Sequence, residues 1–237
     1  SMQSHGVDAT YYGHCSVGVL HIRPVLNLKD PNGIKILRAL EEEMSDMALE
    51  YGGAMSAEHG DGLARSEWIP KMFGEQIVSL FEQTKEAFDP NGLMNPGKIV
   101  HAQKMDENLR YGAAYVANSS ETFFTFDSEG GFQEAVELCS GVGQCRKKLV
   151  GTMCPSYMAT LEEEHSTRGR ANVLRAALSG SLEGGLQNEV VYQAMDLCLE
   201  CKACKSECPS NVDMAKLKYE YLAHYYGEHG FPIRSYL

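Results

Sequence analysis

The first hundred residues contain one segment in which apolar and polar positions alternate, as they do in a half-buried β-strand. This segment, residues 11–28, is interrupted at Gly18, with aromatic residues before the interruption and β-branched residues after it. Such a pattern predicts a strand, a tight turn near Gly18 and a second strand.

Elsewhere apolar residues recur every three or four positions, which is the period of an amphipathic helix. Helices are predicted on this basis over residues 34–51, 77–88, 171–178, 189–197 and 213–226. Asp30 and Pro31 supply a start signal for the first helix, and the D-P-N-G turn at residues 89–92 ends the second.

Three regions of different composition follow one another along the chain. Residues 1–103 mix the strand and helix patterns, residues 104–130 form a polar connector that contains three phenylalanines, and residues 131–237 carry most of the cysteines. We therefore expect an α+β domain, a connector that packs onto a neighbour through its phenylalanines, and an all-helical second domain.

The composition is that of a soluble globular protein, since 43% of the 237 residues are hydrophobic and can form a core. The formal net charge of -11, without a basic stripe, argues against a nucleic-acid partner. No apolar stretch is long enough to cross a bilayer, so we expect no transmembrane segment. The chain shows no apolar signal segment, which favours a reducing, cytoplasmic location, or attachment to the inner membrane through a partner.

Four cysteines are concentrated in the segment C-L-E-C-K-A-C-K-S-E-C-P, residues 198–209. Cys198, Cys201 and Cys204 are separated by two residues each, so one tight loop can direct three sulfurs at three corners of an iron–sulfur cluster. Cys208 precedes a proline, and in two-cluster ferredoxins the cysteine at that place binds the other cluster. The segment therefore predicts a second cysteine set elsewhere in the chain.

That second set lies upstream, at Cys139, Cys145 and Cys154. In C-S-G-V-G-Q-C, Val142 stands where a middle cysteine would be, so one iron corner lacks its thiolate. The predicted [4Fe-4S] ligands are Cys154, Cys198, Cys201 and Cys204. Cys139, Cys145 and Cys208 would then hold a three-iron [3Fe-4S] cluster. Val142 resembles the apolar residue at the three-iron site of the iron–sulfur subunits of succinate dehydrogenase and fumarate reductase.

Structural zinc and disulfides are the plainer uses of such cysteines. Zinc favours two knuckles held well apart, whereas four thiolates here share one short run, and disulfides suit dispersed cysteines in an oxidising compartment. Eight residues separate Cys145 from Cys154, where ferredoxins have three. This spacing leaves open a different crossover ligand for the second cluster, or His165 as its fourth ligand.

His14, His21 and Glu58 form a candidate metal site. Residues seven apart on one straight strand face opposite sides, so the two histidines share a metal only if the chain turns near Gly18. Two imidazoles and a carboxylate suit Zn²⁺ or Mn²⁺, with coordination positions open for a substrate. The same ligands are typical of non-heme iron oxygenases, although the ferredoxin-type cysteines argue against that class.

Residues 10–100 resemble the C-terminal, substrate-binding part of flavin-linked oxidases of the vanillyl-alcohol oxidase superfamily, which includes D-2-hydroxyglutarate, D-lactate and glycolate dehydrogenases. The likeness rests on the histidine pair, on E-H-G at residues 58–60 and on F-D-P-N-G-L-M-N-P-G-K at residues 88–98. Residues 15–18, C-S-V-G, depart from the family's G-D-G-N loop, which leaves the substrate open. The resemblance implies that the metal ligands are His14, His21 and Glu58.

The same resemblance implies roles for further residues. His59 would take the hydroxyl proton of a 2-hydroxy acid while hydride passes to FAD. Asn95 and Lys98, in the closing motif, would lie near the flavin. Arg23, two residues after His21, is a candidate for pairing with a substrate carboxylate through its planar guanidinium.

Residues 151–160, G-T-M-C-P-S-Y-M-A-T, and residues 165–171, H-S-T-R-G-R-A, extend the resemblance to the fused flavin and iron–sulfur oxidoreductases, in particular bacterial D-2-hydroxyglutarate dehydrogenases. This implies an α+β fold in which part of an FAD-linked oxidase substrate domain precedes an all-α dicluster ferredoxin-like domain. The implied substrate is a small 2-hydroxy acid of the hydroxyglutarate, lactate or glycolate class. Its electrons would pass through the clusters to a quinone or a carrier protein.

No glycine-rich phosphate-binding loop precedes a helix in the sequence. We therefore expect the chain to be an interior fragment of a longer protein whose other part binds most of the FAD, and to be inactive when purified alone. The alternative is a ferredoxin-like electron-carrier subunit whose first domain docks a separate catalytic partner. Zinc or manganese at the histidine pair would favour the dehydrogenase, and iron in clusters alone would favour the carrier.

Overall fold

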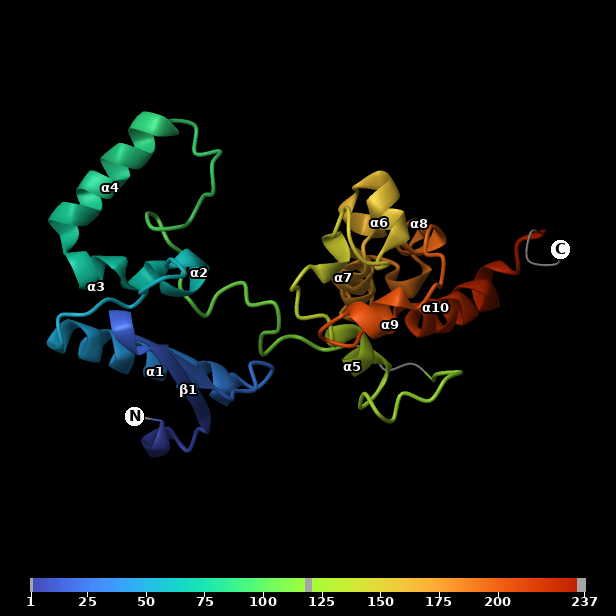
Figure 1. The fold of residues 1–237 in the computed structure, drawn as a ribbon, viewed down its shortest axis with the longest axis horizontal. Coiled ribbons are helices and arrows are strands. Elements are labelled where there is room, and N and C mark those ends of the chain that lie inside the picture. Colours follow the sequence, from blue (N-terminus) through green and yellow to red (C-terminus); the bar gives the residue numbers. More distant parts are fainter. Residues whose placement is uncertain (1, 118–120, 234–237) are drawn as a thin grey trace. The chain divides into compact units, whose positions relative to one another are not determined.

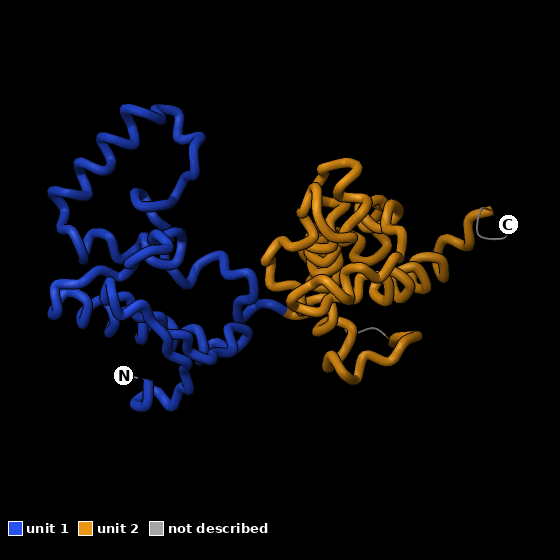
Figure 2. Tube along the Cα trace, in the orientation of Figure 1, with its two compact units in different colours: residues 1–115 blue, residues 116–237 orange. Residues whose placement is uncertain are grey.

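The structure is a computed structural model that describes residues 2–117 and 121–233. The chain divides into two compact units, residues 1–115 and residues 116–237 (Figures 1 and 2). The division falls inside the connector that the sequence predicts over residues 104–130. In the described ranges, no helix is both long and apolar enough to cross a membrane.

The first unit contains a two-stranded antiparallel hairpin of β1 (Ala9–His14) and β2 (Val19–Pro24). His14 lies opposite Val19, and Tyr12 lies opposite His21. Gly18 adopts a left-handed backbone with φ 68°, which a residue with a Cβ rarely tolerates. The predicted strand, turn and strand are therefore confirmed, and the register puts both histidines on one face of the hairpin.

The helices of the first unit follow the hairpin. They are α1 (Pro31–Glu50), α2 (Gly62–Arg65), α3 (Ile69–Phe73) and α4 (Glu75–Phe88), with 3₁₀ turns η1 (Gln3–His5), η2 (Cys15–Val17) and η3 (Ser66–Trp68). Asp30 caps α1, because its side chain accepts a hydrogen bond from the Asn32 backbone N–H at 2.9 Å. The predicted start signal at Asp30 and Pro31 is thus confirmed.

Half-buried ion pairs connect α1 to the later part of this unit. Arg38 on α1 donates to Glu67 and, at 3.0 Å, to Asp106. Glu67 also accepts the backbone N–H of Met105 at 2.8 Å. The Arg38 guanidinium lies 5.6 Å from the centre of the Trp68 ring, which is buried. These contacts hold α1, η3 and the chain after α4 together.

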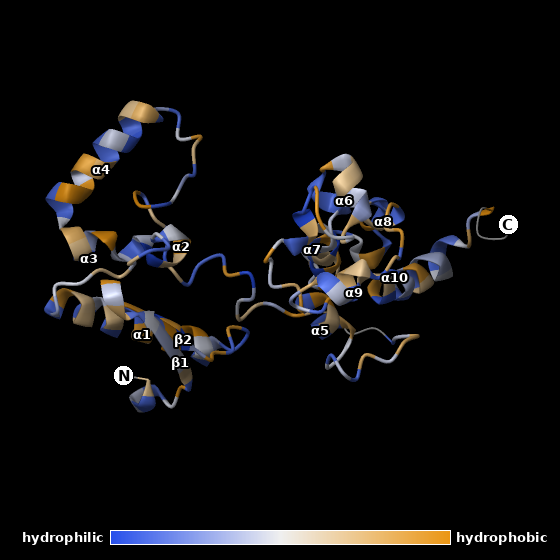
Figure 3. Cartoon of the chain, viewed as in Figure 1, coloured by the Kyte–Doolittle hydropathy of each residue, from blue (hydrophilic) through white to orange (hydrophobic). Residues whose placement is uncertain are grey.

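Helix α4 is amphipathic but exposes its apolar side. It has no buried residue, and Leu80 is 54% exposed. Figure 3 shows hydrophobic and hydrophilic residues alternating along α4. The helix predicted over residues 77–88 is present, but its apolar stripe covers no core within the first unit.

The second unit is helical throughout its described residues. It consists of α5 (Phe132–Glu137), α6 (Pro155–Thr160), α7 (Thr167–Leu178), α8 (Glu189–Asp196), α9 (Ala203–Glu207) and α10 (Met214–His229), with 3₁₀ turns η4 (Gln144–Arg146), η5 (Glu163–His165) and η6 (Gly185–Gln187). The expected α+β fold with a helical second domain is confirmed.

A continuous apolar core occupies the second unit. Its fully buried side chains include Leu174, Val191, Met195, Val212 and Tyr221. Several cluster-type cysteines belong to the same core, among them Cys139, Cys145, Cys154 and Cys204. The cysteine loops are therefore held by well-packed helices and not by flexible surface chain.

Helix α7 begins four residues before its predicted start. Ser166 caps it by accepting the Gly169 N–H at 2.9 Å. A Cβ on Gly169 would lie 2.0 Å from the carbonyl oxygen of Glu163, so only glycine lets η5 approach this closely. The first turn of α7 is consequently packed against η5, and its side chains reach the cysteine loops.

The phenylalanine-bearing part of the connector packs onto the second unit. Phe126 is 3% exposed and belongs to the core. The buried carboxylate of Glu220 on α10 accepts the backbone N–H groups of Phe123, at 3.1 Å, and Phe124, at 3.0 Å. The predicted packing is confirmed for this part, whereas connector residues 118–120 lie outside the described ranges.

Candidate metal centres

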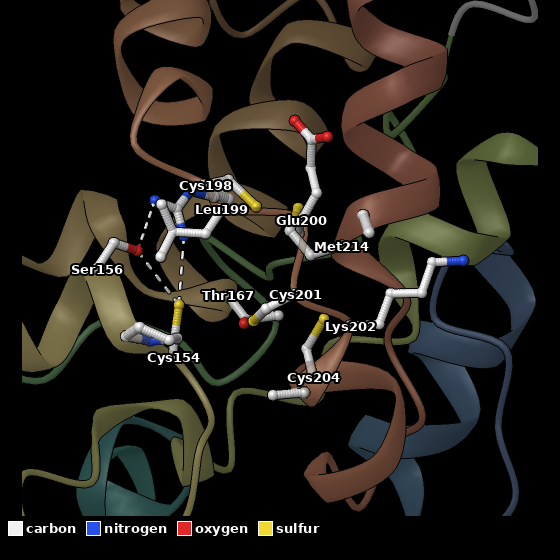
Figure 4. Close-up of a pocket in the computed structure, with 14 residues that line it drawn as sticks. Cys154, Ser156, Thr167, Cys198, Leu199, Glu200, Cys201, Lys202, Cys204 and Met214 are labelled. Carbon is white, nitrogen blue, oxygen red and sulfur yellow. Dashed lines mark hydrogen bonds between the residues drawn. The ribbon is translucent and has the colours of Figure 1, made fainter.

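Four cysteines surround one small pocket of the second unit (Figure 4). Cys154 immediately precedes α6, Cys198 and Cys201 lie on the loop between α8 and α9, and Cys204 lies on α9. We call this the four-cysteine pocket. Its members are the four residues that the sequence groups around a [4Fe-4S] cluster.

The loop that carries Cys198 and Cys201 is held from α10. Lys218, 6% exposed, donates to the carbonyl oxygen of Cys198 at 2.8 Å and pairs with Glu200 at 2.9 Å. Glu200 and Lys202 both adopt positive φ, of 55° and 58°. This tight double turn directs successive cysteines of the motif toward the pocket.

Three cysteines line a second small pocket, to which Val142 also contributes. Cys139 follows α5, Cys145 lies on η4 and Cys208 follows α9. We call this the three-cysteine pocket. Val142 occupies the place where a middle cysteine would be, so the pocket receives no thiolate from there. The Val142 side chain is 61% exposed. His165 does not line this pocket, and its Nδ1 lies 2.9 Å from the hydroxyl of Thr160.

The first turn of α7 lies between the two pockets. Thr167 lines both of them. The backbone N–H of Arg168 donates to the sulfur of Cys145 at 3.3 Å on one side. On the other side the guanidinium of Arg170 contacts Cys154 at 3.4 Å. One helix terminus thus supplies hydrogen-bond donors to cysteines of both pockets.

The cysteine sulfurs of the described residues do not converge as closely as the ligands of one zinc ion would. In a tetrahedral zinc site with Zn–S bonds of about 2.3 Å, the sulfurs lie only about 3.8 Å apart. In the described ranges, the one set of three ligand atoms that meets closely is His14, His21 and Glu58, and no cysteine trio does so. A cubane holds its cysteines wider apart, because each sulfur binds a different iron.

Burial shifts the pKa of several of these thiols. It raises the pKa of the Cys145, Cys198 and Cys204 thiols above the usual value. Burial acts in the same direction on Cys154, but the hydrogen bond to Ser156 and the charge of Arg170 outweigh it and lower the pKa of that thiol. Cys154 therefore has surroundings that favour a thiolate, in contrast to Cys145, Cys198 and Cys204.

A third set of ligand atoms converges on the hairpin of the first unit. His14, His21 and Glu58 each offer an atom within 4.8 Å of the other two. Glu58 comes from the loop between α1 and α2, and its Oε1 lies 2.8 Å from His21 Nε2 and 3.8 Å from His14 Nε2. The turn at Gly18 brings the two histidines to the same face, as the sequence requires.

The geometry at His21 suits a cation better than a hydrogen bond. Its Nε2 atom is buried, yet it makes no hydrogen bond of acceptable direction, although Glu58 Oε1 lies within 2.8 Å. The Tyr12 ring stacks on His21 with centroids 4.4 Å apart and fixes the imidazole plane. A divalent ion between the nitrogens and the carboxylate would satisfy all three atoms.

Family comparisons agree with this division of the chain. Residues 1–99 match the FAD linked oxidases, C-terminal domain, and residues 138–213 match the 4Fe-4S dicluster domain. The chain joins an FAD-linked oxidase C-terminal domain to a 4Fe-4S dicluster domain. The oxidase domain carries the histidine and glutamate site, and the dicluster domain carries both cysteine pockets.

D-2-hydroxyglutarate dehydrogenases align along the whole chain, and a D-lactate dehydrogenase aligns along part of it. D-2-hydroxyglutarate dehydrogenase of Pseudomonas putida is 32% identical and that of Escherichia coli 28% identical, each over 100% of this chain and 26% of the relative. D-lactate dehydrogenase of Archaeoglobus fulgidus is 31% identical over 41% of this chain and 21% of its own length. The chain thus spans about a quarter of the length of these relatives. No solved structure matches it.

Two further predicted residues of the oxidase domain, His59 and Arg23, lie near the metal-type site. His59 Nε2 is 3.1 Å from Glu58 Oε1, and its side chain is 65% exposed. Arg23 is exposed, with its guanidinium 5.1 Å from the centre of the Tyr12 ring. Arg65, which the sequence reasoning missed, lines the same groove as His59. The sequence signal that could have identified Arg65 is its position five residues after Gly60, the last residue of the E-H-G motif.

Asn95 and Lys98 lie apart from the histidine site, in the turn after α4. The Asn95 side-chain oxygen accepts from Lys98 Nζ at 2.8 Å. Both line an open groove with Phe81. Asp89 anchors the turn by accepting the backbone N–H groups of Leu93, at 2.9 Å, and Met94, at 2.8 Å. The turn that begins at the D-P-N-G motif therefore places Asn95 and Lys98 in a groove that Phe81 also lines.

Proposed function

We propose that this chain is part of a flavin- and iron–sulfur-dependent dehydrogenase that oxidises a small D-2-hydroxy acid. The substrate class is that of 2-hydroxyglutarate, lactate or glycolate. One observation carries the proposal: a converging His14, His21 and Glu58 site in an oxidase-type domain shares a chain with two cysteine pockets in a dicluster domain. Aligned relatives named D-2-hydroxyglutarate dehydrogenase support it.

The histidine site provides for binding and deprotonating the substrate hydroxyl. Zn²⁺ or Mn²⁺, when bound there, acts as a Lewis acid that lowers the pKa of the hydroxyl. His14 is 54% exposed, which leaves the open side of the site accessible to a substrate. His59 takes the hydroxyl proton at an imidazole nitrogen and, because its side chain is 65% exposed, returns it to water.

Cationic side chains around the groove provide for the substrate carboxylates. Arg23 follows His21 by two residues on β2, so the two side chains share one face of the hairpin. We assign Arg23 to a substrate carboxylate, which its planar guanidinium can bind with two hydrogen bonds. Arg65, which lines the groove that contains His21 and His59, provides a second positive charge, which suits a dicarboxylate such as 2-hydroxyglutarate.

Electron transfer is assigned to groups bound on both domains. FAD accepts the substrate's hydride when bound, and we assign Asn95 and Lys98 to contacts with it. The four-cysteine pocket is assigned a [4Fe-4S] cluster and the three-cysteine pocket a [3Fe-4S] cluster, which carry electrons singly. A quinone or a carrier protein is the proposed acceptor. The proposed location is cytoplasmic, or peripheral to the inner membrane through a partner.

The test uses Mn²⁺ as a spectroscopic probe. The purified chain should bind one Mn²⁺ through the histidine site, and adding D-2-hydroxyglutarate or D-lactate should change the electron paramagnetic resonance line shape of the bound ion. The His21→Ala variant should lose both effects. Iron in clusters, with neither zinc nor manganese bound to the wild-type chain, would contradict the proposal and favour the electron-carrier alternative.

A further inference from the structure

The dicluster domain contains a fully buried arginine beside the four-cysteine pocket. Arg170, on α7, has a relative exposure of 0%. Its Nε donates to the carbonyl oxygen of Ala194 at 2.7 Å, its Nη2 to the hydroxyl of Ser156 at 3.0 Å, and its Nη1 to the sulfur of Cys154 at 3.4 Å. Ser156 in turn donates to the carbonyl oxygen of His165 at 2.9 Å. Figure 4 shows Ser156 and Cys154 at the end of these hydrogen bonds.

Arg170 has no carboxylate partner in the parts of the chain that the structure describes, whereas two other cations near the cysteines each have one. Lys218 pairs with Glu200 at 2.9 Å, and Arg168 pairs with Glu163 at 2.7 Å. Burying a charge without an opposite charge is costly. Among the three groups that Arg170 contacts, the Cys154 sulfur alone can carry negative charge.

The cluster with its four thiolate ligands would supply the negative charge that balances Arg170. Four thiolates around an iron–sulfur cubane give a net anion, and adding an electron makes it more negative. A guanidinium held in a low-dielectric interior at one ligand sulfur stabilises the reduced form more than the oxidised form. It therefore raises the reduction potential.

We propose that Arg170 is the buried counter-charge of the cluster held by Cys154, Cys198, Cys201 and Cys204, and that it sets the reduction potential of that cluster. The inference rests on the cluster assignment made under the proposed function. It assigns to Arg170 on α7 a role in electron transfer, although Arg170 is not a ligand of the cluster.

The three-cysteine pocket supplies a matched control. Arg168, two residues earlier on the same helix, has a side chain that is 25% exposed and neutralised by Glu163. Its contact with Cys145 uses the backbone N–H, which any residue at that position retains. Replacing the Arg168 side chain therefore removes a positive charge that Glu163 already neutralises.

The experiment is a redox titration of the anaerobic full chain, followed by electron paramagnetic resonance of the four-iron cluster. The Arg170→Gln variant should lower the ratio of reduced to oxidised cluster at a fixed potential at least tenfold, which for one electron is 59 mV. Arg170→Lys, which keeps the charge, and Arg168→Gln should each change that ratio less than about threefold, well under this 59 mV step.

The main signal of a second measurement comes from the wild-type protein. Wild-type protein labelled with ¹⁵N at the arginine guanidinium should show a weak ¹⁵N coupling in the pulsed spectrum of the reduced four-iron cluster, and Arg170→Lys should remove it. An unchanged potential in cluster-loaded Arg170→Gln, or no ¹⁵N coupling in the wild type, would overturn the role of Arg170 alone. A wild-type chain without iron and acid-labile sulfide would overturn the cluster assignment as well.

Discussion

The two units of this chain hold their candidate sites in opposite ways. The dicluster unit encloses its cysteines in a core whose members, such as Leu174 and Met195, are completely buried. The oxidase unit carries its histidine site on a two-stranded hairpin, and α4 buries nothing. The difference teaches that core packing fixes the proposed cluster ligands, whereas a strand register and one loop fix the proposed metal ligands.

The largest effect that distinguishes the two units should come from a buried cysteine. Replacing Cys204 with serine should remove most of the iron of the four-cysteine pocket and destabilise the dicluster unit, because a core side chain is also a ligand. The exposed Cys15 provides the control, and Cys15→Ser should leave iron and sulfide unchanged. Iron and sulfide analysis of anaerobic protein makes the measurement, and full iron content in Cys204→Ser would show that the pocket is not a cluster site.

A core deletion tests the packing contrast directly. Leu174→Ala should destabilise the dicluster unit by about 2–5 kcal/mol, since Leu174 is 0% exposed. Leu80→Ala, on the exposed face of α4, should cost no more than about 0.5 kcal/mol. Native-state hydrogen exchange of amides in α7 and in α4 measures both changes. Equal losses in the two helices would contradict the difference between the units.

Removal of one histidine ligand tests the site on the hairpin. His21→Ala should weaken Mn²⁺ binding about 100-fold or more, because it removes a ligand and the imidazole that Tyr12 orients. His101→Asn is the matched control in the same unit, since asparagine tolerates the positive φ of 53° at that residue. Isothermal titration with Mn²⁺ measures the affinity, and similar binding by both variants would place the metal elsewhere.

The smallest expected effect concerns the pH dependence of the oxidase unit. The hydrogen bond from Arg38 holds the pKa of Glu67 below the ordinary value of 4.5 for a glutamate. A carboxylate with a lowered folded-state pKa contributes stability at pH values above 4.5, and loses that contribution as the pH falls through the lowered value. Glu67→Gln should remove about 1 kcal/mol of this acid-sensitive stability.

The chain's single tryptophan reports on this ion pair, because the Arg38 guanidinium lies 5.6 Å from the centre of the Trp68 ring. Urea unfolding followed by Trp68 fluorescence should give wild type and Glu67→Gln different stabilities at about pH 7, and the difference should shrink as the pH falls through the lowered pKa of Glu67. A constant difference across this range would show that Glu67 stabilises the fold without its charge.

The sequence predicted the long elements because they span several repeats of their hydrophobic period. The hairpin and the helices α1, α4, α7, α8 and α10 all overlap the ranges that the pattern predicted, although α7 begins four residues earlier. The pattern missed α5, α6 and α9, which have five or six residues each and make fewer than two turns. Such short helices owe their stability to packing against the core, and an amphipathic period cannot reveal them.

The candidate sites were predictable where the residue spacing of a motif identifies the ligand residues. Cysteine spacing grouped Cys154 with the 198–204 cysteines, and the structure puts the same four around one pocket. It could not distinguish Arg168 from Arg170, because two arginines in H-S-T-R-G-R-A read alike. Only the position of α7 shows that one guanidinium is paired with Glu163 and the other is buried against a sulfur.

The most direct test of the account measures iron and acid-labile sulfide in the anaerobically purified chain, together with its electron paramagnetic resonance. The account predicts about seven iron and eight sulfide ions per chain, with a three-iron signal in the oxidised protein and a four-iron signal after reduction. A colourless chain that holds zinc on its cysteines, with neither iron nor sulfide, would contradict it.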